Sequence, residues 1–177
     1  DIRLGGRLRA LTLLRQAAQR RPEALPILAY CLRTAKEPHE GIAVCRASLE
    51  HEQFQSDVLG HLWSFLNELQ DDHQALTIAE KRLRLFPQDA AAVNDLVDSL
   101  LLLGRIDEAV AYAHRYAICT ENSDLALKTL FRTYEQSGRW AELAEEFERR
   151  LIVMRAPTVD TLARYGEVLT ELTRFDE

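Results

Sequence analysis

The 177-residue sequence predicts an all-α fold, a right-handed superhelical α-solenoid of antiparallel helix hairpins. The first observation is a five-residue sequence motif that recurs along the chain. Gly-Arg-Ile-Asp-Glu at 104–108 returns as Gly-Arg-Trp-Ala-Glu at 138–142 and as Thr-Arg-Phe-Asp-Glu at 173–177, at intervals of 34 and 35 residues. The second is composition: helix formers dominate, and only 7 Gly and 5 Pro are present. A repeat period in this range is typical of stacked supersecondary units.

The first helix of each repeat is indicated by an apolar stripe. Windows of 34 residues that begin at 22, 56, 90 and 124 place apolar residues at window positions 4, 7, 8 and 11. This spacing puts the four residues on one side of a helix. The stripe holds Leu25, Leu28, Ala29 and Leu32, then Leu59, Leu62, Trp63 and Leu66, then Val93, Leu96, Val97 and Leu100, then Leu127, Leu130, Phe131 and Tyr134.

The second helix of each repeat follows a short turn and carries mostly small residues at positions 20 and 24, which let it approach the first helix closely. Gly104 and Gly138 stand where the first helix must end, and glycine adopts the left-handed conformation there without strain. Lys36, Gln70 and Thr173 occupy the equivalent points, so we expect weaker or differently shaped turns at these three positions.

The repeats place the expected boundaries along the whole chain. We predict one solenoid domain over 1–177, with repeats at 22–55, 56–89, 90–123 and 124–158 and partial repeats at 1–21 and 159–177. In the last of these, a fifth repeat starts after a one-residue insertion, with Leu162, Tyr165, Gly166 and Leu169 on its stripe. Because both ends divide a repeat, we expect the chain to be a fragment of a longer solenoid.

These positions together resemble the tetratricopeptide repeat (TPR) family, of the bacterial type, over nearly the whole chain. The resemblance rests on Leu59, Leu62, Leu66, Ala75, Ala79 and Pro87 in one repeat, and on Leu96, Leu100, Gly104, Ala109 and Ala113 in the next. The repeats that begin at 22 and 124 diverge, with Gly41 and Leu143 at position 20 and Arg150 at position 27.

Charge and motifs exclude several function classes. Residues 1–21 hold six Arg against one Asp, so this part carries +5 of a total of −6 and the rest carries −11. An acidic body disfavours nucleic-acid binding, and no apolar run is long enough for membrane insertion. The basic start is interpreted as a solvated helix face, with contact to an anionic lipid or nucleic acid as the alternative.

No residues for chemistry emerge from the sequence, so we expect no catalytic residue, cofactor or metal site. The five histidines fall at unrelated repeat positions, and no phosphate loop or nucleophile motif is present. Cys31, Cys45 and Cys119 form no CxxC pair and suit a reducing compartment. Cys31 and Cys45 are interpreted as packed thiols, with a redox pair as the alternative.

The resemblance implies a concave surface, lined by first helices, that binds a peptide or a partner helix. The expected partner-binding residues are Tyr30, Arg33, Asn67, Asn94, Asp98, Leu101, Lys128 and Arg132. The family's clamp for a chaperone carboxylate is not expected, because Gly60 and Ser64 replace its first pair and Asp98 replaces its central Asn. An Arg132–Asp98 ion pair is the structural alternative for these two residues.

The sequence therefore predicts a non-catalytic scaffold for protein–protein interaction, with a protein or peptide partner of unknown identity. An alternative is the regulatory or docking arm of a larger bacterial enzyme or of a secretion or polysaccharide-export component. RNA binding in the manner of pentatricopeptide repeats is disfavoured by the 34-residue spacing and the acidic body. We expect a cytoplasmic protein, with the periplasm as the alternative, and self-association through exposed terminal repeats.

Overall fold

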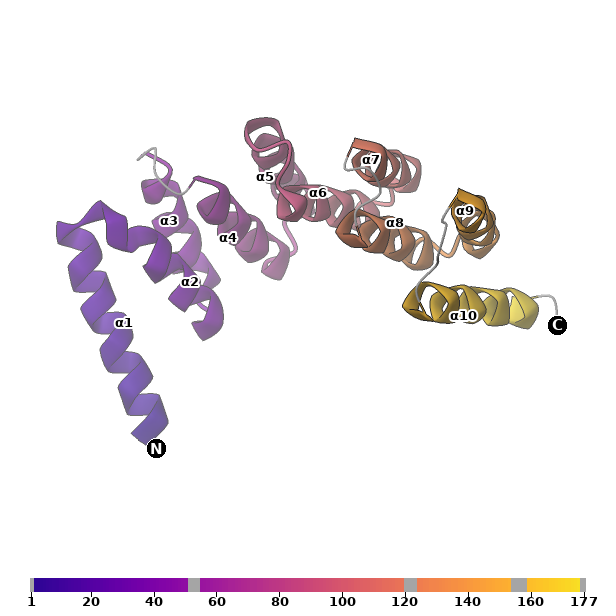
Figure 1. Ribbon diagram of the computed structural model, residues 1–177. Helices are drawn as coiled ribbons and strands as arrows, with labels where there is room; N and C mark the ends of the chain where they lie inside the picture. The colour runs from indigo at the N-terminus through magenta and orange to yellow at the C-terminus, as the bar shows by residue number, and fades with distance from the viewer. Residues whose placement is uncertain (1, 51–54, 120–123, 154–158, 176–177) are drawn as a thin grey trace. The chain divides into compact units, whose positions relative to one another are not determined.

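The computed structural model describes residues 2–50, 55–119, 124–153 and 159–175, and within these ranges the regular structure is helical throughout. Each helix falls inside a predicted repeat, to within one residue. The chain divides into two compact units, residues 1–104 and 105–177 (Figure 1). Unit 1 contains α1 (Ile2–Arg20), the 3-10 turn η1 (Pro22–Ala24), α2 (Leu25–Ala35), α3 (Pro38–Ser48), α4 (Gln55–Glu68), α5 (Asp72–Leu85) and α6 (Ala90–Leu102), and unit 2 contains α7 (Ile106–Cys119), α8 (Asp124–Gln136), α9 (Trp140–Val153) and α10 (Val159–Phe175).

Unit 1 is a row of helices in which each helix packs against the next along the chain. In addition, α2 packs against α4, and α4 packs against α6. The first helices of successive repeats are therefore neighbours, as the periodic stripe predicts. In unit 2, α7 packs against α8, α8 against α9, and α9 against α10. The all-α helical-repeat fold expected from the sequence is confirmed.

The predicted stripe is buried between the helices. Leu62, Leu96 and Leu130, which share position 7 in three repeats, are 3%, 1% and 0% exposed. Most other stripe residues are also buried, and Leu25, Trp63 and Leu127 are half-buried. Burying a large apolar side chain stabilises a fold by about 1.5–3 kcal/mol, so this repeated contact is the main source of stability.

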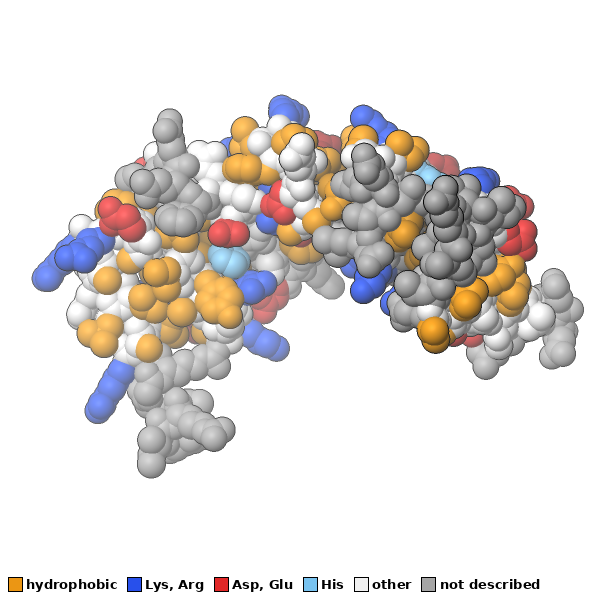
Figure 2. Space-filling model, viewed as in Figure 1, with side chains coloured by type: hydrophobic (Ala, Val, Ile, Leu, Met, Phe, Trp, Pro, Cys, Tyr) orange, Lys and Arg blue, Asp and Glu red, His pale blue; other side chains and the backbone are white. Residues whose placement is uncertain are grey.

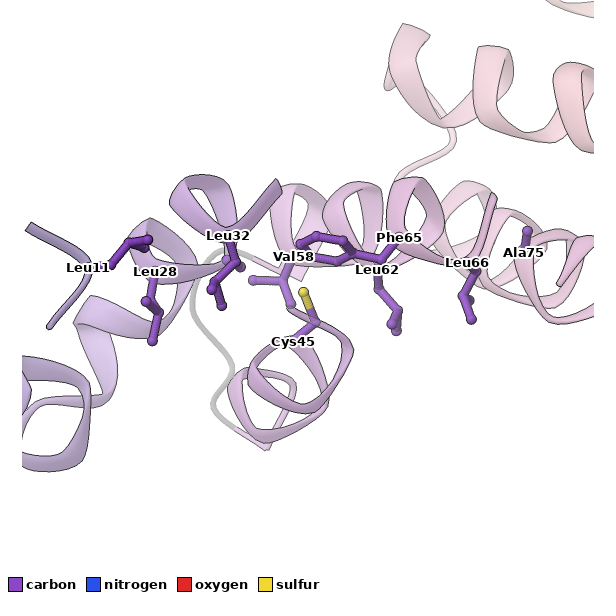
Figure 3. Close-up of a cluster of buried hydrophobic side chains, with 10 residues drawn as sticks. Leu11, Leu28, Leu32, Cys45, Val58, Leu62, Phe65, Leu66 and Ala75 are labelled. Carbon is purple, nitrogen blue, oxygen red and sulfur yellow. The ribbon is translucent and has the colours of Figure 1, made fainter. Parts of the chain in front are cut away.

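One cluster of the core joins five helices of unit 1. Figure 3 shows Leu11 from α1, Leu28 and Leu32 from α2, Cys45 from α3, and four residues of α4 that line up beside Ala75 of α5. Phe65 of α4 is fully buried there, and its ring fills the space that a Cβ atom on Gly41 of α3 would need. Gly41 at position 20, where the repeat pattern has Ala, therefore makes room for the large ring of Phe65.

The turns between the two helices of a repeat are more uniform than the sequence suggests. Gly104 and Gly138 adopt φ values of 70° and 69°, as predicted. Lys36 and Gln70 adopt the same left-handed conformation, with φ of 59° and 58°. The expectation of differently shaped turns is wrong for these two residues, because the backbone hydrogen bonds that close the helix outweigh the Cβ strain.

The last helix departs from its predicted register. Leu162 and Leu169, expected on the buried stripe, are 48% and 41% exposed, and Val168 is buried instead. Tyr165 packs against Phe147 of α9, with ring centroids 5.6 Å apart. Thr173 lies inside α10, whereas Gly104 and Gly138 follow the ends of α6 and α8.

Candidate functional site: the first-helix surface of unit 1

The surface of interest is made by the sides of α2, α4 and α6 that face away from the buried stripe. We call it the first-helix surface and define it by positions 5, 9 and 12 of these helices, with position 6 added on α2 and α4 only. Apolar side chains gather over α1 and α2 on the face shown in Figure 2, with basic and histidine side chains beside them. Within the helices, every fourth or third residue returns to this side, so each helix contributes a short row of side chains.

On α2, Tyr30 is 51% exposed and Arg33 is exposed. The guanidinium carbon of Arg33 lies 5.5 Å from the centroid of the Tyr30 ring, which is a cation–π contact. The sequence-predicted residues Tyr30 and Arg33 are therefore in direct contact and both reach solvent.

On α4, His61 faces Tyr30, with ring centroids 5.9 Å apart. Burial lowers the pKa of His61, and the nearby charges of Arg33 and Arg82 lower it further, while Asp57 acts in the opposite direction. His61 is a residue that the sequence reasoning missed. His61 occupies position 6 of its repeat, next to position 5, which belongs to the predicted binding surface. Its place beside that position was the signal in the sequence that could have identified it.

The other predicted lining residues are less exposed. Asn67 on α4 is half-buried, and its Oδ1 atom is buried without a hydrogen-bond partner among the described residues. On α6, Asn94, Asp98 and Leu101 are all half-buried. Lys128, which is exposed, and Arg132, which is half-buried, lie on α8 and belong to unit 2.

Beneath this surface, a buried polar network ties α4, α5 and α6 together. Arg82 of α5 forms an ion pair with Asp95 of α6 and a second one, at 3.0 Å, with Asp89, which caps α6. Arg82 also donates to the Ser56 hydroxyl at 3.2 Å, and this hydroxyl donates to Asp89 at 2.5 Å. Burial raises the pKa of Asp95 to about 6, although Arg82 opposes this shift.

A second chain of hydrogen bonds runs alongside. The indole Nε1 of Trp63 donates to the Ser99 hydroxyl at 2.8 Å, and Ser99 donates to the backbone carbonyl of Asp95 at 2.8 Å. Trp63 was predicted as a packing residue, and this contact gives it a second role in joining α4 to α6. The two networks hold α4 and α6, two of the three helices that carry the first-helix surface, in register.

The described residues hold little that could perform chemistry. In the described part of the chain, no group of three His, Cys, Asp or Glu side chains lies close enough to hold a metal ion. Cys31, Cys45 and Cys119 are free thiols, and burial raises the pKa of Cys45 to about 12. Cys45 is therefore a packed, protonated thiol at neutral pH. Across the described helices, none is both long enough and apolar enough to cross a membrane.

Comparison with known structures defines the class. A TPR protein from Thermus thermophilus, TTC0263, matches with a TM-score of 0.62 and 21% identity over 96% of this chain and 93% of that chain. A TPR protein from Parabacteroides merdae matches with a TM-score of 0.69 and 16% identity over 98% and 71% of the two chains. YrrB, described as a TPR protein with an unusual peptide-binding site, matches with a TM-score of 0.67 and 16% identity over 96% and 85%. The fold is therefore that of a tetratricopeptide repeat protein.

The family is defined by sequence. The model of the ChAPs family, the Chs5p-Arf1p-binding proteins, matches residues 4–129. This chain belongs to the ChAPs family. No curated protein matches it. The bacterial type expected from the sequence stays a prediction, because structures at this level of identity show the fold alone.

Proposed function

We propose that this chain is a non-catalytic scaffold that docks a protein partner on its first-helix surface. The observation that carries the proposal is the contrast between the two sides of α2: Leu28, Ala29 and Leu32 are buried, whereas Tyr30 and Arg33 on the other side are open to solvent. An exposed aromatic residue beside an arginine is the composition found at binding hot spots.

The name of the family supports a protein partner. Its members are described as binding Chs5p and Arf1p, and we propose that this chain binds proteins equivalent to these two. The peptide-binding site described for YrrB supports the use of a TPR surface for an extended segment. Groove-binding segments bring anchor side chains at regular spacing, which a row of parallel first helices can receive.

The proposal is tested by isothermal titration of the chain with purified Chs5p and Arf1p. Replacing Tyr30→Ala together with Asn94→Ala should weaken binding about thirtyfold or more, because truncating a hot-spot residue costs at least ~2 kcal/mol. The matched control is Glu80→Ala with Arg84→Ala on the exposed side of α5. Equal weakening by both double variants, or a lower melting temperature for the first alone, would argue against docking at the first-helix surface.

A further inference from the structure

The α2–α4 surface, defined as Ile27, Tyr30 and Arg33 of α2 with His61 of α4, combines apolar area with one cation. Ile27 and Tyr30 are 56% and 51% exposed, and with Arg33 they follow one another at intervals of three residues. Such residues are neighbours along one side of a helix. Two large apolar side chains and a guanidinium are thus presented side by side to solvent.

Arg33 has no carboxylate partner within the described ranges of the chain. Its guanidinium contacts the Tyr30 ring at 5.5 Å, and no Asp or Glu of the described part forms an ion pair with it. Several other arginines do have such partners: Arg15 pairs with Glu40, Arg82 with Asp89 and Asp95, and Arg105 with Glu108. The five donors of Arg33 are therefore available, in the fork geometry that binds a carboxylate through two hydrogen bonds.

The electrostatic effect of Arg33 reaches its neighbour. Burial has the largest effect in lowering the pKa of His61, and the charge of Arg33 has the next largest. The charge of Asp57 only partly opposes this effect of Arg33. The α2–α4 surface thus carries a cation at Arg33, whereas residues 22–177 carry a net charge of −11. An acidic segment that approaches the chain meets attraction at this surface and repulsion over most of the rest.

We propose that the α2–α4 surface receives an acidic side chain and an adjacent large apolar side chain of an extended partner segment. The acidic group pairs with Arg33, and the apolar group covers Ile27 and Tyr30. This inference rests on the proposed docking function and adds the chemistry of the partner. Burial of the apolar contact also removes water from the ion pair, which strengthens the pair.

The test is a selection of random eight-residue peptides, displayed on phage, against the whole 177-residue chain. The wild-type chain should enrich peptides in which Asp or Glu stands next to Leu, Ile, Phe or Trp. Arg33→Glu should reverse the charge preference and enrich Lys or Arg beside the same apolar residues. The matched control is Arg84→Glu, which makes the same charge change at an exposed site on α5 and should leave the acidic preference intact.

One selected peptide is then measured by fluorescence anisotropy. Arg33→Met and Ile27→Ala should each weaken its binding about tenfold, equivalent to about 1.4 kcal/mol, and Arg84→Met should leave it unchanged. The pKa of His61, followed by NMR, should rise in Arg33→Met because one of the charges that lower it is gone. An unchanged urea midpoint would show that the variant stays folded.

The outcomes separate the inference from the proposed function. Peptides enriched without acidic residues, or the same acidic preference with Arg33→Glu, would overturn the inference while leaving a docking surface in place. No enrichment on the wild-type chain, together with no binding of Chs5p or Arf1p, would overturn both.

Discussion

Gly41 and Phe65 form a complementary pair between two repeats. A Cβ atom on Gly41 would lie 2.2 Å from Cζ of Phe65, and the Phe65 ring is fully buried. We expect Gly41→Ala to lower the free energy of unfolding in urea by about 1–3 kcal/mol, although Ala is the better helix former. The control is Gly166→Ala in α10, where a Cβ would meet nothing within 4 Å, and it should raise that free energy by about 0.5–1 kcal/mol.

A double-mutant cycle tests whether the effects of Gly41 and Phe65 on stability are coupled. Phe65→Leu removes the ring that occupies the space beside Gly41, so Gly41→Ala should cost less in the Phe65→Leu background than in the wild-type chain. A coupling of about 0.5–3 kcal/mol is expected for residues in contact. Additive effects of the two substitutions would show that the ring and the glycine are independent.

Asp95 should make stability depend on pH. Burial raises its pKa to about 6, above that of a carboxyl group in an unfolded chain, so the folded state binds this proton more tightly. The stability from this group is fully present below about pH 4 and is lost as the pH rises through about 6. Urea unfolding from pH 4 to 7 should therefore show the wild-type chain losing stability relative to Asp95→Asn. An Asp95 carboxyl that titrates near pH 4 by carbon NMR would contradict this.

At the scale of the helices, the turns at Lys36, Gln70, Gly104 and Gly138 share one left-handed conformation but differ in strain. Gln70 adopts φ 58° with a side chain, whereas Gly104 adopts φ 70° without one. A residue with a Cβ costs about 1–2 kcal/mol in this conformation. Gln70→Gly should therefore raise the free energy of unfolding by up to about 1 kcal/mol, after allowance for the freer unfolded chain, and Gly104→Ala should lower it by about as much. The control is Gln70→Ala, which should change stability little because it keeps the Cβ.

The sequence was sufficient for the features that recur at a fixed spacing. The stripe residues and the glycine turns follow from local rules that apply along the repeats. Features that depend on one particular neighbour could not be read in this way. Arg82 at position 27 departs from the repeat pattern, and only its position beside Asp95 explains its burial.

In the candidate site too, some residues could be predicted from the repeat spacing and others depend on one particular neighbour. The sequence placed Tyr30 and Arg33 on the side of α2 that proves open to solvent. It did not single out His61, because its place beside Tyr30 depends on how α2 and α4 pack together. In α10, the spacing alone predicted burial of Leu162 and Leu169, but burial needs a covering helix as well as a stripe, and both are exposed.

For the molecule as a whole, the repeats should be stable only in combination. In α4, Leu59, Leu62, Phe65 and Leu66 are buried by contacts with α2, α3, α5 and α6. A peptide of residues 55–89 keeps only the contacts between α4 and α5. Each large apolar side chain left uncovered forfeits about 1.5–3 kcal/mol, and a few such losses match the total stability of a typical domain, about 5–15 kcal/mol.

We therefore expect the 55–89 peptide to show little helix by far-ultraviolet circular dichroism, whereas residues 22–104 should be helical and unfold cooperatively in urea. The longer fragment keeps α2, α3 and α6 on both sides of the central pair, so the nearest-neighbour contacts that dominate in repeat arrays remain. The two samples contain the same central helices, so a difference in helicity per residue measures what the neighbours contribute. Equal helicity per residue would mean that local helix preference, rather than contact between repeats, holds the fold together.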